Sequence, residues 1–77
     1  MRNELIKAFQ SHAKGHIDKH VANVEVLLTK PMGIAEHPDV IETIEKEVRI
    51  IADYDDLLSM IDKYFVKINS SKKLAKV

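Results

Sequence analysis

The 77-residue chain contains no cysteine and no tryptophan, and only two glycines and two prolines. Without cysteine it cannot form a disulfide scaffold, a thiolate zinc site or a cysteine nucleophile. Twelve Lys and Arg side chains balance twelve Asp and Glu side chains, so no net charge attracts the chain to nucleic acid or to an anionic membrane. No apolar run approaches the length of a membrane-spanning helix, and none follows the first residues as in a signal peptide. We therefore expect a small cytoplasmic protein with no membrane contact and no cofactor.

Apolar residues recur with helical spacing over about residues 3–29. They follow one another at steps of three or four: Ile6, Phe9, Ala13, Ile17, Val21, Val24 and Leu28. Such steps place side chains on one face of an α-helix. Pro31 disfavours helical backbone at Lys30, and Gly33 permits a reversal of the chain. The pattern predicts a helix that ends near Thr29 and is followed by a turn.

A second helical pattern covers about residues 38–67. Pro38 suits a first helical turn, and Asp39 places negative charge at the positive end of the helix. Helical spacing continues through Val40, Ile41, Ile44, Val48, Ile51, Tyr54, Leu58, Ile61 and Phe65. Asn69-Ser70-Ser71 should end the helix. We expect one domain over residues 1–68, followed by a basic, mobile tail over residues 69–77.

Two long helices with a short connection predict an all-α fold, a long antiparallel helical hairpin. The apolar arc of the second helix is wider than contact with a single neighbouring helix requires. It leaves a surplus strip that we expect to be an interface: Ile50, Tyr54, Leu57, Ile61 and Tyr64. Scattered apolar residues on a monomer are the simpler alternative. A homodimer that closes two hairpins into a four-helix bundle would cover the strip.

Three histidines, His12, His16 and His20, stand four residues apart on one side of the first helix. Histidines at this spacing can chelate a divalent metal, with Glu47 or Asp55 as a further ligand. In a hairpin that turns near residue 33, however, facing residue numbers sum to about 67. His20 then faces Glu47 and His12 faces Asp55, so that each carboxylate can bond to a ring. We favour these register pairs over a metal site, and we expect acidification from about pH 8 to about pH 6 to leave the fold intact or slightly stabilised.

No catalytic signature is present. The chain lacks the glycine patterns that bind phosphates or dinucleotides, a G-x-S-x-G turn and any cysteine–histidine pair. Four lysines lie in or just before the basic tail, Lys67, Lys72, Lys73 and Lys76, but the tail has no arginine or aromatic residue, which disfavours a nucleic-acid site. We therefore do not expect an enzyme.

Three stretches resemble a small uncharacterised protein family of marine tailed bacteriophages, of the cyanophage kind. The resemblance covers most of residues 2–65. It is carried by Gly15-His16-Ile17-Asp18-Lys19-His20-Val21-Ala22-Asn23-Val24-Glu25-Val26, by Pro31-Met32-Gly33-Ile34-Ala35-Glu36-His37-Pro38-Asp39-Val40 and by Ile51-Ala52-Asp53-Tyr54-Asp55-Asp56. It implies a phage or marine metagenome origin and a host-cytoplasm setting. It implies no activity and no functional residue.

The sequence thus predicts a non-enzymatic helical interaction or adaptor protein, a phage accessory or host-directed factor that forms a homodimer and binds a protein partner of unknown identity. Two alternatives remain open. One is a metal-binding or metal-stabilised helical bundle that uses the three histidines. The other is a small nucleic-acid accessory protein that uses the basic tail.

Overall fold

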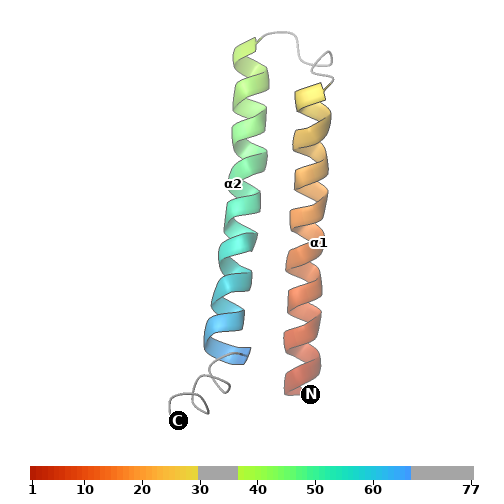
Figure 1. Cartoon of the computed structure of the whole chain (residues 1–77), viewed down its shortest axis with the longest axis vertical. Coiled ribbons are helices and arrows are strands. Elements are labelled where there is room, and N and C mark those ends of the chain that lie inside the picture. Colours follow the sequence, from red (N-terminus) through yellow and green to blue (C-terminus); the bar gives the residue numbers. More distant parts are fainter. Residues whose placement is uncertain (30–36, 67–77) are drawn as a thin grey trace.

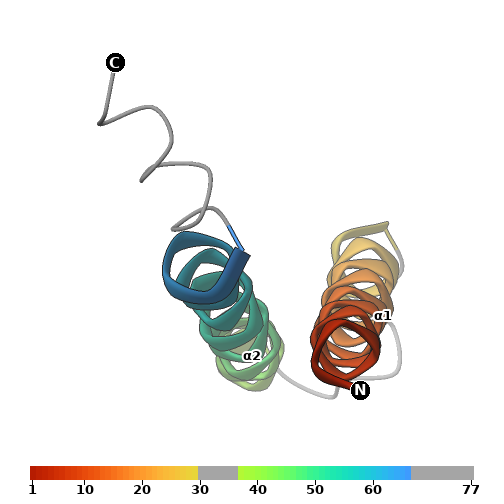
Figure 2. The ribbon, with the colours of Figure 1, turned by 90° about the horizontal axis from the view of Figure 1, so that it is seen from below.

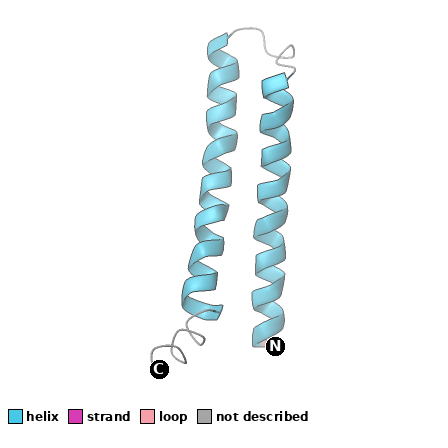
Figure 3. Cartoon of the chain, viewed as in Figure 1, coloured by secondary structure: helices cyan, strands magenta, loops and turns pink. Residues whose placement is uncertain are grey.

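The computed structural model describes residues 1–29 and 37–66. Their order is α1 (Arg2–Thr29), α2 (His37–Ile61) and the short π-helix η2 (Asp62–Val66). Every described element is a helix (Figure 3). The predicted turn near Gly33 and the predicted tail over residues 69–77 lie outside the described residues.

α1 begins one residue before its predicted start and ends at the predicted Thr29. At its first turn the amino group of Met1 pairs with the carboxylate of Glu4 at 2.7 Å. At its last turn the Thr29 hydroxyl donates to the carbonyl of Glu25 at 2.8 Å, within the same helix. The first contact pairs opposite charges at the start of the helix, and the second gives a hydrogen bond to a carbonyl near its end, where backbone groups lack helical partners.

α2 begins at His37 and carries Pro38 and Asp39 in its first turn, as the sequence indicated. The Thr43 hydroxyl donates to the carbonyl of Asp39 at 2.7 Å. On the exposed surface, Arg49 donates to the carboxylate of Glu45 at 2.6 Å across one helical turn. These local contacts support the helix, whereas its position depends on α1.

The sequence predicted an uninterrupted α-helix to about residue 67, but the α-helix ends at Ile61. From Asp62 to Val66 the backbone widens into η2. No glycine or proline marks this change, so helical spacing alone could not reveal it. At the same end of the molecule, Arg2 Nη2 donates to the carbonyl of Phe65 at 2.8 Å and so links the start of α1 to the end of η2.

The two long helices lie antiparallel and side by side (Figure 1). Viewed along its length, the described part of the chain is one layer in which each helix has a single helical neighbour (Figure 2). The structure therefore confirms the predicted all-α helical hairpin for the described residues. None of the described helices holds a stretch long and apolar enough to cross a membrane.

The contact between the helices is thin. Among the described residues, Ala13 is the one fully buried side chain. Val21 and Leu28, which the sequence placed on the inner face of the first helix, are exposed. His16 and His20 lie half-buried in the contact instead. The inner face of α1 is thus partly polar, which its apolar spacing did not indicate.

Candidate functional site

A polar cluster occupies the middle of the contact between α1 and α2. His20 Nδ1 lies 2.6 Å from Glu47 Oε1. Asn23 Nδ2 donates to the same carboxylate oxygen at 2.9 Å. The His20 and Glu47 side chains are only 11% and 20% exposed, so little water competes for this contact. The predicted pairing of His20 with Glu47 is confirmed, and with it the register in which facing residue numbers sum to about 67.

The second predicted register pair is wrong. Tyr54 contacts His12, with the two rings edge to face at 5.8 Å between centroids. Asp55 lies on the opposite side of the hairpin, in a polar groove with Gln10 and Lys14. The register is correct to within one residue, but one residue along a helix rotates a side chain by about 100°, which is enough to move Asp55 away from His12.

His16 stacks on Tyr54. The ring centroids are 4.5 Å apart and the planes are within 3° of parallel. The His12 ring meets the His16 ring edge to face at 4.6 Å between centroids, and the His20 ring lies 6.1 Å from that of His16. The three histidines thus form a row of ring contacts along α1, next to one tyrosine of α2.

This environment shifts two titratable groups. The pKa of His16 is lowered from its ordinary value, mainly because desolvation disfavours the charged ring and further because His12, Lys19 and His20 are cationic neighbours. The pKa of Glu47 is lowered because hydrogen bonds from His20 and then Asn23 stabilise the carboxylate. The middle of the hairpin therefore favours a neutral His16 and a charged Glu47.

The metal alternative required His12, His16, His20 and Glu47 or Asp55 to converge. Within residues 1–29 and 37–66, no three His, Asp or Glu side chains gather in a way that could hold a metal ion. The His16 ring faces Tyr54, and one nitrogen of His20 faces Glu47. The lysines of the nucleic-acid alternative, Lys67, Lys72, Lys73 and Lys76, lie outside the described residues.

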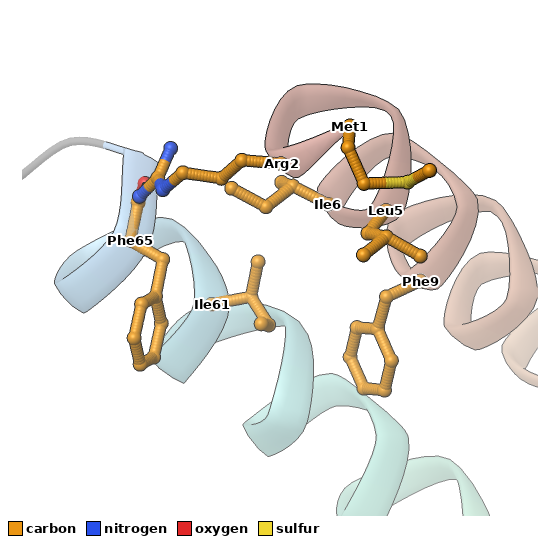
Figure 4. A pocket seen from close by; sticks show the side chains of 7 residues that line it. All are labelled: Met1, Arg2, Leu5, Ile6, Phe9, Ile61 and Phe65. Carbon is orange, nitrogen blue, oxygen red and sulfur yellow. The ribbon is translucent and has the colours of Figure 1, made fainter.

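The two helices form an apolar pocket at the end of the hairpin where α1 begins and η2 ends. We call this end the open end and its cavity the end pocket. The cavity measures about 540 Å³. Figure 4 shows the side chains that line it: Met1, Arg2, Leu5, Ile6, Phe9, Ile61 and Phe65. Arg2 has the only charged side chain among these seven, and its guanidinium already bonds to the carbonyl of Phe65.

The predicted interface strip divides into two parts. Ile50, Tyr54 and Ile61 are half-buried against α1, and Tyr54 is covered by histidine rings. Leu57 and Tyr64 are 42% and 48% exposed. The strip is therefore not wholly free for a partner.

The exposed part of the strip continues into the end pocket. Leu57 precedes Ile61 by one helical turn and lies on the same face of α2. We call the combined surface of Leu5, Phe9, Leu57, Ile61 and Phe65 the apolar face, with Tyr64 at its edge. Sequence reasoning missed the contributions of Leu5 and Phe9 from α1. The available signal was that Leu5 and Phe9 are four residues apart and, in the predicted register, lie opposite the last apolar turns of α2.

No protein-family model matches the chain, and no curated protein or solved structure is detectably similar to it.

Proposed function

We propose that this chain is a non-enzymatic helical interaction or adaptor protein that binds partners through its apolar face. The observation that carries the proposal is the position of that face. Large apolar side chains from both helices meet at one end of the hairpin and remain partly exposed beside a pocket. Contiguous exposed apolar surface of this kind is typical of interaction sites.

The apolar face suits a partner helix. Its members recur at helical spacing on two parallel ridges, with a groove between them at the end pocket. An amphipathic helix can lay its apolar side into such a groove. Arg2, at the rim, offers a cation to an acidic residue of the partner.

The polar cluster supports a structural role more than a catalytic one. Glu47 receives hydrogen bonds from His20 and Asn23, and the His16 ring is stacked on Tyr54. These contacts lie between α1 and α2 and fix the register of the hairpin. The side chains of the polar cluster therefore contact one another inside the hairpin, which is the arrangement expected of a structural role.

The resemblance to the marine phage family supports the setting of this proposal, a phage accessory or host-directed factor in the host cytoplasm. The two alternatives are separated by direct measurements. A melting temperature that falls on addition of chelator and recovers with zinc would favour the metal-stabilised bundle. Salt-sensitive retention on DNA would favour the nucleic-acid accessory protein.

The decisive experiment compares the wild-type chain with two variants as bait in affinity capture from host lysate. Leu57→Glu places a charge on the apolar face, whereas Val48→Glu places the same charge at a similarly exposed site, 46% against 42%, on another side of α2. We expect a captured protein that is lost with Leu57→Glu and retained with Val48→Glu. Equal capture by all three baits would contradict the proposal.

A further inference from the structure

We propose that the apolar face docks onto a second copy of this chain, so that two hairpins form a four-helix bundle around their end pockets. This inference rests on the proposed function, because it names the partner of the same surface. It also revises the interface expected from the sequence, since it uses Leu5 and Phe9 of α1 together with α2 and assigns Tyr54 to the interior of the hairpin.

The first argument is burial. A small domain without disulfides or bound metal needs long packed helices or oligomerisation to bury enough apolar surface. Among the described residues only Ala13 is fully buried, and the middle of the contact is made by polar and aromatic rings. A second hairpin is the simplest source of the missing burial, because it brings the same surplus apolar surface.

The second argument is area. Five large side chains on and beside the apolar face are between 42% and 85% exposed: Met1, Leu5, Leu57, Tyr64 and Phe65. At roughly 200 Å² for each large side chain, they expose on the order of 550 Å² in one copy. Two copies would then bury about 1,100 Å², which exceeds the roughly 1,000 Å² expected of a specific interface.

The third argument is shape. In a two-fold symmetric dimer the same surface must fit itself, so that it needs a projection as well as a hollow. The end pocket supplies the hollow, with a cavity of about 540 Å³. Leu57 supplies the projection, because it is exposed and lies one turn from Ile61 at the edge of the pocket. In the bundle, Leu57 of each copy enters the end pocket of the other.

The fourth argument is polarity. The other side of the hairpin has a smaller groove, about 340 Å³, and polar residues line most of it, among them Lys14, Asp55 and Asp62. Docking there would remove charged groups from water at a cost in free energy. The five side chains of the apolar face are uncharged, and Arg2, which also lines the end pocket, already bonds to the carbonyl of Phe65. Docking on the apolar face therefore removes fewer charged groups from water.

The test measures molar mass in solution by sedimentation equilibrium, over a range from about 1 to about 200 µM, together with the dependence of melting temperature on concentration. The variants are Leu57→Glu and Leu5→Glu on the apolar face, with Val48→Glu as the matched control. Leu5 is 61% exposed, so replacing it removes little packing within the hairpin. We expect a dimer for the wild type and for Val48→Glu, with a melting temperature that rises with concentration. Each apolar-face variant should weaken association by at least about 100-fold.

A wild-type monomer at the highest concentration, or dimers whose strength is the same in all four proteins, would overturn the inference. If an apolar-face variant fails to fold at low concentration but folds on concentration, the inference is supported. If the unfolding of an apolar-face variant does not depend on concentration and the wild type is monomeric, the result counts against the inference. A monomeric chain that still captures a protein in a Leu57-dependent way would leave the proposed function in place and remove only the self-docking.

Discussion

The same two helices make polar contacts with each other in the middle of the hairpin and leave apolar side chains partly exposed at its open end. In the middle, side chains such as His20 and Glu47 find polar partners across the contact. At the open end, Leu5, Phe9 and Phe65 meet around a pocket that the hairpin does not fill. The comparison shows two kinds of contact: directional polar contacts set the register in the middle, whereas apolar surface stays partly exposed at the open end, where we propose that a partner binds.

The largest expected effect within the chain is at Glu47. Its replacement in Glu47→Ala leaves His20 and Asn23 without their acceptor in a half-buried site, so we expect a loss of about 2 kcal/mol in the free energy of unfolding. The matched control is Glu45→Ala, which breaks an exposed pair with Arg49 and should cost less than about 0.5 kcal/mol. Urea denaturation at neutral pH measures both. If the two variants lost the same free energy of unfolding, the contact of Glu47 with His20 would stabilise the chain no more than the surface pair of Glu45 with Arg49.

The second prediction concerns the loss of stability in acid, which should arise from titratable groups of the polar cluster and not from the apolar face. The folded-state pKa of His16 is lowered, so below its unfolded pKa of about 6.5 the unfolded chain takes up the proton more readily than the folded one. Stability is therefore lost as pH falls from about 6.5 toward the folded pKa. The pKa of Glu47 is lowered too, and its contribution is present above about pH 4.5 and lost as pH falls through the folded pKa.

We thus expect the melting temperature to fall in two steps, the first in mild acid. This is the reverse of the sequence-based expectation, which considered the pairing of His20 and His12 and left His16 out. In His16→Gln, which cannot take up a proton, the first step should vanish and the second remain. A first step that persists in His16→Gln would show that another group causes it.

The third prediction concerns the link between the start of α1 and the end of η2. In Arg2→Ala the hydrogen bond from the guanidinium to the carbonyl of Phe65 is lost. Because Arg2 is exposed, we expect a global cost of no more than about 1 kcal/mol. Amide hydrogen exchange should nevertheless accelerate in residues 61–66 and stay unchanged near Glu47, since the open end can loosen locally. Acceleration spread evenly along α2 would contradict a local role.

Much of the fold follows from helical spacing and from turn residues. Long periodic segments indicated two helices, Pro31 and Gly33 indicated the reversal, and facing residue numbers that sum to about 67 placed His20 opposite Glu47. These features depend on local chemistry and on the simplest antiparallel geometry, which a sequence displays directly.

The errors arise where rotation about a helix axis matters. Tyr54 rather than Asp55 contacts His12, and Val21, which was expected on the inner face of α1, is exposed. In each case neighbouring positions compete for the contact, and the choice depends on how α1 and α2 are rotated against each other. The widened backbone of η2 adds a further rotation at the open end, which helps to explain why the end pocket was not predicted.

The smallest expected effect is at Gly15. Its replacement tests whether another helix packs against the side of α1 that carries Gly15. Apart from its chain neighbours and the nearby backbone of its own helix, an added Cβ at Gly15 would meet no atom within 4 Å, so Gly15→Ala introduces no clash with α2. Alanine restricts the unfolded backbone and suits a helix interior better than glycine, which predicts a gain of about 0.5–1 kcal/mol in the free energy of unfolding. The gain should appear in urea denaturation, and the proposed self-association should keep its strength, because Gly15 lies outside the apolar face. A loss of association in Gly15→Ala would mean instead that another helix approaches closely at Gly15, and it would move the interface away from Leu5 and Leu57 to the outer side of α1.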